Sequence, residues 1–389
     1  MIINNKRALA YITTIRGIYP IEGYDRVEHA EVLGWRVIVS KNDNFKVGDK
    51  CVYFEVDSLC PASDERFAFL EKRHYKIKTI KMCGVYSQGL VMPVSAFKEF
   101  SEDIEENTDV TDILGIKYYV EEDNARKADT PATPTLNAKY KKLAKKPIIK
   151  KLMKYNWFRK VFYAFFGQKK QKNAKEFPTN FPYVHKTDEE RIENLPHLVG
   201  YENPLIATEK LDGTSCTYIL ERKKHGKFEF YVTSRNVRQL TPDQSCYHES
   251  NIYWELANKY KIEDKLKKYL EDNPDLEYVC IQGEGVGNVQ GNPLKLKEND
   301  LYVFNFIRSD IGRLDSIKGK NIISAWDMKW VPILDTKYML PKTMEEIKVA
   351  SEGKSVVNPD VMREGIVFRD PTNDLSFKSV SRSYLLNHS

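Results

Sequence analysis

The residues best suited to covalent chemistry in this chain are a lysine and the acidic residue that closely follows it. Lys210 stands two residues before Asp212 and Gly213 in the string TEKLDGTS at 208–215. A lysine amine that desolvation or nearby cations keep partly neutral can attack the α-phosphate of a nucleotide and form a phosphoramide. Alone this is a weak signal, because a Lys-x-Asp-Gly string occurs by chance in roughly one chain of this length in ten.

More strings that could support this chemistry follow in order along the chain. They are KFEFYVTSRN at 227–236, YVCIQGEGVGNVQGN at 278–292, LYVFNFIRSD at 301–310, REGIV at 363–367 and SFK at 376–378. In type, order and spacing the series resembles motifs I, Ia, III, IIIa, IV and V of the covalent nucleotidyltransferases. That superfamily contains the ATP-dependent RNA and DNA ligases and the capping guanylyltransferases, and the resemblance covers residues 181–389.

The resemblance implies a catalytic role for each matching residue. Lys210 would attack ATP, and Lys378 would contact the α-phosphate and compensate charge in the transition state. Three carboxylates, Asp212, Glu284 and Glu364, would hold a hydrated Mg²⁺ or Mn²⁺ through its water molecules, since hard cations prefer oxygen ligands. A buried salt bridge is the alternative role for Glu284, and a solvated surface position is the alternative for Lys378.

The remaining nucleotide contacts are also implied by the resemblance. Adenine would be recognised around Glu209 and stacked on Phe304 or Phe306, although aromatic residues that alternate along a strand are as often part of a core. Arg235 matches an arginine that contacts the RNA ends, with a surface turn as the alternative. Arg191, in the segment FPYVHKTDEERIENLP at 181–196, matches an arginine that reaches the β- and γ-phosphates.

The chain departs from the family pattern at one position of motif V. The family often has a second lysine two residues after the first, and here that position is Val380. Either Arg382 replaces that lysine, or Arg191 and the basic connector hold the pyrophosphate. The attack by Lys210 does not depend on this contact.

The position of the catalytic block within the chain distinguishes the branches of the superfamily. DNA ligases and capping enzymes carry an OB domain after motif V, but only eleven residues follow Lys378, too few for a folded domain. Residues 1–95 instead contain alternating runs separated by the turn signals Glu22-Gly23 and Val47-Gly48-Asp49, which predicts a small β-barrel. The strings VGDKCVYFEVDSLCP and IKMCGVYSQGLVMP resemble the N-terminal OB domain of one branch of RNA ligases.

The predicted fold class is therefore α+β with three parts. Residues 1–120 form an OB-type β-barrel that binds nucleic acid, 121–180 a basic linker with an amphipathic helix, and 181–389 an ATP-grasp-like nucleotidyltransferase domain with antiparallel sheets. Because all the catalytic motifs lie in 181–389, we expect the barrel to be dispensable for the reaction with ATP and needed for joining RNA ends.

A run of even-numbered basic residues predicts an RNA-binding stripe on the barrel. If 72–79 is a strand, Lys72, Lys76 and Lys78 share one face with His74 and can contact phosphates. Tyr75 and Ile77 then point into the barrel. An ordinary solvated face is the alternative.

The connector carries most of the excess positive charge of the chain. Between Thr130 and Lys175 there are fourteen Lys or Arg residues and no acidic residue. The string IIKKLMKYNWFRKVFYAFF at 148–166 predicts a basic amphipathic helix with Lys150 and Lys154 on its polar side. This helix could bind RNA phosphates, pack on a domain or lie on a membrane surface; it is too short and too charged to span a bilayer.

Cysteine usage and the N-terminal sequence indicate a cytoplasmic protein. The six cysteines show no Cys-x-x-Cys spacing and lie mostly in apolar strings, which predicts buried free thiols in a reducing compartment. No signal peptide opens the chain, since its first residues contain no sustained apolar run.

We expect an ATP-dependent RNA ligase that joins 3′-OH and 5′-phosphate ends through a lysyl-AMP intermediate in RNA repair, with nicked duplexes among its substrates. The alternatives are a DNA-sealing enzyme of the same superfamily and a non-catalytic nucleic-acid-binding protein with a decayed ligase domain. The intact set of Lys210, Asp212, Glu284, Glu364 and Lys378 argues against decay.

Overall fold

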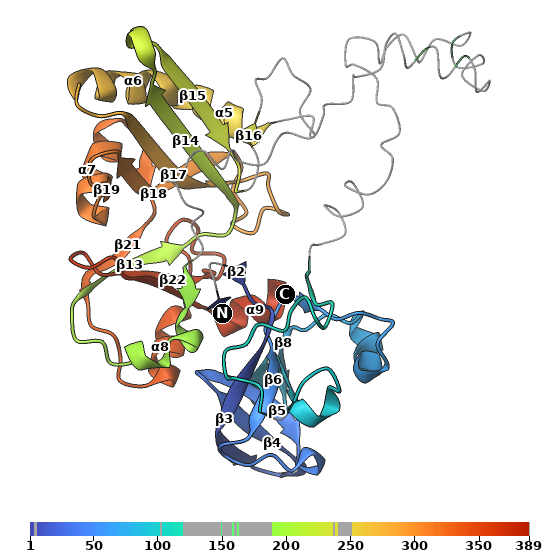
Figure 1. Ribbon diagram of the computed structural model, residues 1–389. Helices are drawn as coiled ribbons and strands as arrows, with labels where there is room; N and C mark the ends of the chain where they lie inside the picture. Colours follow the sequence, from blue (N-terminus) through green and yellow to red (C-terminus); the bar gives the residue numbers. More distant parts are fainter. Residues whose placement is uncertain are drawn as a thin grey trace.

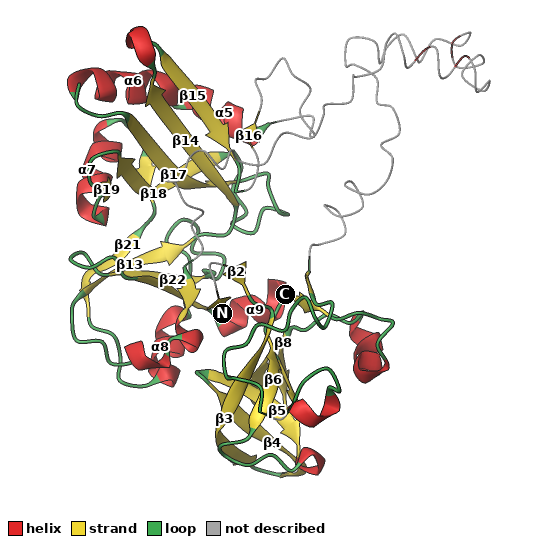
Figure 2. Ribbon diagram, viewed as in Figure 1, coloured by secondary structure: helices red, strands yellow, loops and turns green. Residues whose placement is uncertain are grey.

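The computed structural model describes residues 1–3, 6–101, 103–119, 149, 158, 162, 189–235, 238–239 and 251–388. These residues form an N-terminal domain built on one curled sheet and a C-terminal domain built on two sheets (Figure 1). Strands dominate both domains, and the helices lie mainly around the C-terminal sheets (Figure 2). The predicted α+β class is confirmed.

The N-terminal domain is a curled antiparallel sheet with the strand order β10-β6-β3-β4-β5. Its strands are β3 (Ala10–Ile21), β4 (Tyr24–Val32), β5 (Trp35–Ser40), β6 (Lys50–Phe54) and β10 (Leu90–Pro93). The long strand β3 pairs with β6 through its first half and with β4 through its second half, and its register shifts between Ile15 and Gly17. Such a bulge increases the local twist and lets one strand turn the sheet toward a barrel.

Short elements complete this domain. The hairpin of β8 (Thr79–Met82) and β9 (Val85–Gln88) lies beside β5, and two smaller pairs join β1 (Ile2–Ile3) to β2 (Lys6–Arg7) and β7 (Ser58–Leu59) to β11 (Lys117–Tyr118). The predicted turns form at Gly23 and Gly48, whose φ angles of 77° and 98° favour glycine.

The predicted strand at 72–79 is wrong. Residues Glu65–Arg73 form the 3-10 helix η2, which ends at His74 and Tyr75, both in the left-handed region with φ near 51° and 60°. Two such residues in succession break the alternation that an extended strand would impose. Lys76 is consequently buried, Lys72 is exposed on the helix and Lys78 is half-buried, so the three lysines form no stripe. Ile77 does enter the core, with Tyr75 packed against it.

The C-terminal domain contains two sheets that share the region around Lys210. The first sheet consists of β12 (Glu190–Arg191), β23 (Ser376–Val380), β22 (Gly365–Arg369), β13 (Leu205–Lys210) and β21 (Ile333–Tyr338), in that order. Helix α8 (Met344–Ser351) contributes Ile347 to the core on one face of this sheet, beside Phe368 and Phe377.

The second sheet is larger and is covered by three helices. Its strands are β14 (Thr214–Arg222), β15 (Phe228–Thr233), β16 (Arg238–Gln239), β17 (Tyr278–Val286), β18 (Asp300–Arg308), β19 (Gly312–Arg313) and β20 (Lys329–Trp330). Apolar residues of α5 (Ile252–Lys259), α6 (Ile262–Asp272) and α7 (Ser316–Ala325) form one core with strands β14, β17 and β18. The last helix, α9 (Arg382–His388), follows β23 and lies against β8 of the N-terminal domain.

Most of the basic connector lies outside the described residues, including Lys150 and Lys154. Within it, positions 149, 158 and 162 are helical, and the rings of Phe158 and Phe162 stack with centroids 5.9 Å apart. No helix in the described residues is long and apolar enough to cross a membrane. Five of the six cysteines are free thiols, four of them buried, while Cys246 lies outside the described residues.

Candidate active site

The proposed nucleophile lies where the chain passes from one sheet to the other. Lys210 is the last residue of β13 in the first sheet, and Thr214 begins β14 in the second. Leu205 and Ala207 of β13 lie in the core together with Ile347 of α8. Because side chains alternate along a strand, Lys210 points to the opposite face of the sheet. The connection is tight, because a Cβ added at Gly213 would collide with the carbonyl oxygen of Gly285. The glycine of the Lys-x-Asp-Gly string is thus needed for this close approach.

Lys210 is held by a carboxylate from the neighbouring strand. Its Nζ donates a hydrogen bond of 2.7 Å to Oε2 of Glu364, the residue that directly precedes β22. Gly365 is the register partner of Lys210, and a Cβ at Gly365 would clash with the backbone of Ser379. The Lys210 side chain is 26% exposed and that of Glu364 is 16% exposed, so the pair is open to a ligand on one side.

Glu284 approaches the same point from the second sheet. It lies on β17 and is the register partner of Ser215 of β14. Ser215 comes two residues after Gly213 in the sequence. The pKa of Glu284 is raised to about 8, chiefly by burial and also by the nearby carboxylates of Glu364 and Asp212, while Lys210 opposes the shift. Burial likewise raises the pKa of Glu364. These carboxylates are therefore poorly compensated in the ligand-free protein, which suits a site that takes up a cation.

The pKa of Lys210 reflects the balance of the same charges. Burial by itself lowers it, but Glu364, Glu284 and Asp212 together raise it above its usual value. The amine is thus protonated and unreactive in the ligand-free protein. A divalent cation that attracted the carboxylates away from Lys210 would remove the interactions that raise this pKa. Among the described residues, no group of three or more His, Cys, Asp or Glu side chains is arranged to ligate a metal directly.

Two predicted phosphate ligands lie side by side on the first sheet. Arg191 of β12 is the register partner of Lys378 of β23. Lys378 pairs with Val367 of β22, and Val367 pairs with Thr208 of β13. Because Thr208 lies two positions before Lys210 on the same strand, Arg191 and Lys378 lie on the same face of the sheet as Lys210. Arg191 also contacts the N-terminal domain. Its guanidinium lies 3.6 Å from Oδ2 of Asp57 and 5.5 Å from the centroid of the Trp35 ring.

The two aromatic candidates are separated by a β-bulge in β18. The register with β17 shifts between Gln282 and Gly283, so Val303 and Phe306 enter the core although three positions separate them. Phe306 is fully buried against Tyr269 and Trp326. Phe304 is half-buried at the bulge, with the guanidinium of Arg369 5.9 Å from its ring centroid. Of the two, only Phe304 is left in a position to stack on a base.

Two further predicted contacts are Glu209 on β13 and Arg235 just after β15. Glu209 points to the face opposite Lys210; its Oε2 accepts a 2.8 Å hydrogen bond from the backbone of Val356, and its buried Oε1 has no partner among the described residues. Burial raises the pKa of Glu209. Arg235 is exposed just after β15 and helps to lower the pKa of Glu284. Arg382 is bonded to Glu345 and not directed at Lys210.

Two residues of this region carried no recognisable sequence signal. Tyr384 of α9 donates a hydrogen bond to Oδ2 of Asp212. Asn194 lies between the domains: its Oδ1 accepts from Trp35 at 2.6 Å and Tyr11 at 3.1 Å, and its Nδ2 donates to Glu55 at 3.0 Å. In each of these contacts the two partners are separated by between 139 and 183 positions in the sequence.

Comparison with known proteins agrees with this architecture. Residues 203–381 match the RNA ligase family model, and residues 9–94 match a model described as an OB-fold domain. A search of curated proteins found no significant match. Two sheets that meet at a Lys-x-Asp-Gly string behind a small barrel place the chain in the covalent nucleotidyltransferase class.

Solved structures extend the match over both domains. Naegleria gruberi RNA ligase with PPi is 29% identical, with a TM-score of 0.74 over 98% of this chain and 99% of that one. Variants of the same ligase with ATP and Mn and with AMP and Mn are 28% and 29% identical at TM-scores of 0.73, with the same coverage of both chains. The chain is therefore an RNA ligase of the branch with an N-terminal OB-fold domain. The predicted resemblance is confirmed, and nothing supports the alternatives.

Proposed function

We propose that this RNA ligase consumes ATP, with Mg²⁺ or Mn²⁺, and joins 3′-OH to 5′-phosphate RNA ends through an AMP bound covalently to Lys210. The observation that carries the assignment is the amine of Lys210, bonded to Glu364 and surrounded by Glu284 and Asp212 at the junction of the two sheets. The Naegleria structures contain ATP, AMP, Mn and PPi, the molecules that such a reaction uses or releases.

The first step transfers AMP from ATP to the enzyme. Nζ of Lys210 first loses a proton to solvent. Its lone pair then attacks the α-phosphorus, the bond from that phosphorus to the bridging oxygen breaks, pyrophosphate leaves, and a second proton leaves the nitrogen to give the phosphoramide. A divalent cation would supply charge neutralisation at the phosphates. The side chains of Asp212, Glu284 and Glu364 would hold it, and Lys378 would neutralise the α-phosphate oxygens as charge develops.

The two later steps pass AMP to the RNA and remove it. An oxygen of the RNA 5′-phosphate attacks the lysyl-AMP phosphorus and the bond to Nζ breaks, which gives an RNA capped by AMP. The 3′-OH of the other end then attacks the RNA phosphorus, a phosphodiester forms and AMP leaves. Both ends must lie near Lys210, and Arg235 is our candidate to contact them.

Unpaired buried atoms support the nucleotide contacts. Nε and Nη1 of Arg191 are buried without a hydrogen-bond partner among the described residues, as donors for β- and γ-phosphate oxygens would be. The orphan Oε1 of Glu209 is an acceptor suited to the amino group of adenine, and Phe304 is our candidate for the stacking face.

Labelling with ATP tests the nucleophile. We expect wild-type protein incubated with α-labelled ATP and Mg²⁺ to retain label after denaturation and to lose it in acid, as a phosphoramide does. Lys210→Ala should retain no label but still join RNA that already carries AMP at its 5′ end, because only the first step needs the amine. Lys329→Ala is the matched control, since Lys329 is also paired with a carboxylate, at 2.6 Å from Asp300. Covalent label on Lys210→Ala would refute the assignment.

Substrate assays test which nucleic acid ends the protein joins. RNA ends should be joined in preference to DNA ends, and a nicked duplex should be among the accepted substrates. The use of nicked duplexes as substrates and the cytoplasmic location stay predictions.

A further inference from the structure

Helix α9 links the OB-fold domain to the catalytic site. It follows β23, the strand that carries Lys378, after one intervening residue. Glu352 fixes its start by accepting hydrogen bonds from Oγ of Ser381 at 2.7 Å, the backbone N–H of Arg382 at 2.8 Å and Oγ of Ser383. A carboxylate at this end also complements the helix dipole. The start of α9 is thus firmly placed.

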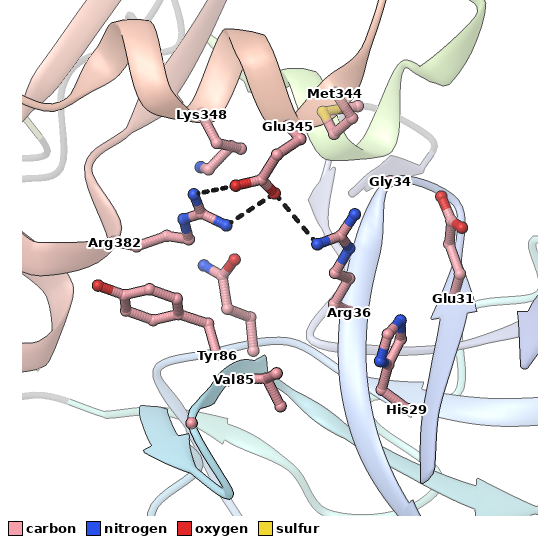
Figure 3. A pocket seen from close by; sticks show the side chains of 12 residues that line it. His29, Glu31, Gly34, Arg36, Val85, Tyr86, Met344, Glu345, Lys348 and Arg382 are labelled. Carbon is pink, nitrogen blue, oxygen red and sulfur yellow. Dashed lines mark hydrogen bonds and ion pairs between the residues drawn. The ribbon is translucent and has the colours of Figure 1, made fainter. Parts of the chain in front are cut away.

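Arg382, the first residue of α9, faces the OB-fold domain. It lines a cavity of about 230 Å³ between the domains, together with Arg36 of β5 and Tyr86 of β9 (Figure 3). Its guanidinium forms two hydrogen bonds to Glu345 of α8, at 2.7 and 3.0 Å, and lies 4.8 Å from the centroid of the Tyr86 ring. Glu345 also pairs with Arg36 at 3.1 Å. One carboxylate therefore bridges an arginine of each domain.

Two residues further along, Tyr384 reaches the catalytic site. It is only 6% exposed, and its hydroxyl donates to Oδ2 of Asp212. Asp212 lies between β13 and β14 and pairs with no strand, so its backbone alone does not fix the carboxylate. A hydrogen bond from a buried hydroxyl selects one orientation of such a carboxylate.

We propose that Tyr384 is a positioning residue for Asp212, and that the OB-fold domain supports it through Glu345 and the start of α9. This inference rests on the proposed function, in which Asp212 helps to hold the hydrated cation. Docking of the OB-fold domain then promotes the reaction with ATP as well as RNA binding. A purely structural role for Tyr384 is the competing explanation, and it predicts lost stability without a changed requirement for the cation.

The first experiment measures Lys210 adenylylation against Mg²⁺ concentration in Tyr384→Phe. The variant loses only the hydroxyl, and we expect the half-saturating Mg²⁺ concentration to rise roughly tenfold, as for the loss of one hydrogen bond to a charged group. Tyr201→Phe is the matched control, because Tyr201 donates a 2.7 Å hydrogen bond to Asp370 in the same domain. It should titrate like the wild type, and melting temperatures of both variants report on folding.

Asp212→Asn separates this inference from the proposed function. If Asp212→Asn shifts the Mg²⁺ titration and Tyr384→Phe does not, the positioning role is refuted while the assignment of Asp212 stands. If Asp212→Asn leaves the titration unchanged, the assignment of Asp212 itself is wrong and the inference falls with it. Shifts in both variants, with Tyr201→Phe unchanged, support the inference.

The second experiment tests the link to the OB-fold domain. Glu345→Gln should raise the Mg²⁺ requirement in the same direction by roughly threefold, the scale of a partly exposed ion pair. Combined with Tyr384→Phe it should add nothing, since both act through one hydrogen bond. Glu106→Gln, which breaks an ion pair of 2.7 Å to Arg16 within the OB-fold domain, is the control. Additive effects of the two variants, or no effect of Glu345→Gln, would contradict the link.

Discussion

At the scale of single residues, the main feature is a nucleophile held in its unreactive form. Glu364 accepts a hydrogen bond from the protonated amine of Lys210, and three carboxylates raise the pKa of that amine. We propose that the same carboxylates also bind the cation, so the cation and the amine of Lys210 compete for them. Cation binding would thus activate Lys210 and prepare ATP together. This coupling would limit reaction of the amine before both substrates are present.

Ionisation of Glu284 should lower the stability of the protein as the pH rises from about 4.5 to about 8. The pKa of Glu284 is about 8 in the folded protein, above its ordinary value of 4.5. Between these values the folded state binds more protons than the unfolded state, so the contribution of Glu284 to stability falls as pH rises from about 4.5 to about 8. Active-site charges are commonly kept at such a cost.

Glu284→Gln should therefore stabilise the metal-free protein, and more at pH 8 than at pH 5. The expected gain at pH 8 is on the order of a few kcal/mol and at most roughly 5 kcal/mol, since the shift from 4.5 to about 8 is worth about 1.4 kcal/mol per unit. Thermal unfolding in the presence of a chelator would measure it, with the exposed Glu22→Gln as the control. An equal change in melting temperature at both pH values would show that Glu284 is not perturbed.

The resemblance to the motifs of the covalent nucleotidyltransferases, carried by residue types, order and spacing, was enough to predict the cluster around Lys210. The string around Lys210 and the strings that contain Glu284, Glu364 and Lys378 lie on or beside strands, which strand periodicity can locate. Tyr384 and Asn194 could not be predicted in this way. Their roles depend on partners more than a hundred positions away, and a tyrosine or an asparagine has no distinctive local pattern.

At the scale of elements, two irregularities interrupt the strand alternation on which the sequence interpretation relied. The left-handed residues His74 and Tyr75 end a helix where a strand was expected, and the bulge in β18 moves Phe304 out of step with Phe306. The break at His74 and Tyr75 involves no glycine or proline, the residues that usually mark such irregularities in a sequence, whereas the bulge in β18 lies opposite Gly283 of β17. Gly23 and Gly48, by contrast, marked their turns correctly.

The position of Lys76 leads to a prediction about stability. Lys76 is 6% exposed, and its Nζ lies 3.6 Å from the centroid of the Tyr119 ring. Lys76→Glu should destabilise the protein by roughly 2 to 4 kcal/mol, because it buries a carboxylate against an aromatic face. Lys72→Glu, on the exposed side of η2, should change stability by less than about 0.5 kcal/mol. Denaturant unfolding would compare them, and equal stability of the two variants would place Lys76 at the surface.

At the scale of the whole molecule, the two domains are joined by a buried polar interface. Asn194 accepts hydrogen bonds from Trp35 and Tyr11 and donates to Glu55, while the backbone N–H of Gly34 donates to the carbonyl of Glu193 at 2.7 Å. The expectation that residues 1–95 can be removed without affecting the reaction with ATP no longer follows. Their removal would take Trp35 and Asp57 away from Arg191 and leave the core residues after position 95 without their barrel.

Asn194→Ala tests how strongly this interface holds. The variant leaves the indole N–H of Trp35 and the hydroxyl of Tyr11 buried without their acceptor, which should cost roughly 2 to 4 kcal/mol. Lys210 adenylylation should also slow, since the neighbouring Arg191 would lose its fixed position. Calorimetry and α-labelled ATP would measure the two effects, with the exposed Asn203→Ala as control. Unchanged stability and labelling would mean that the domains dock through other contacts.

The last prediction concerns the basic connector, whose lysines lie outside the described residues. If Lys150, Lys151, Lys154 and Lys160 contact phosphates, reversing all four charges should weaken binding of every RNA sequence alike. The slope of log affinity against log salt should then flatten by roughly 3, since each lost contact removes about 0.7 to 0.9 released counterions. Adenylylation by ATP alone should barely change.

The same variant distinguishes the other two roles of the connector. If its helix lies on a membrane surface, the variant keeps its RNA affinity and loses binding to anionic vesicles. A variant unchanged in both assays would leave packing on a domain as the explanation. The control reverses four exposed lysines on the helices that cover the second sheet, namely Lys261, Lys267, Lys268 and Lys318. Equal loss of RNA affinity in the control would show that net charge alone, and not the connector, governs binding.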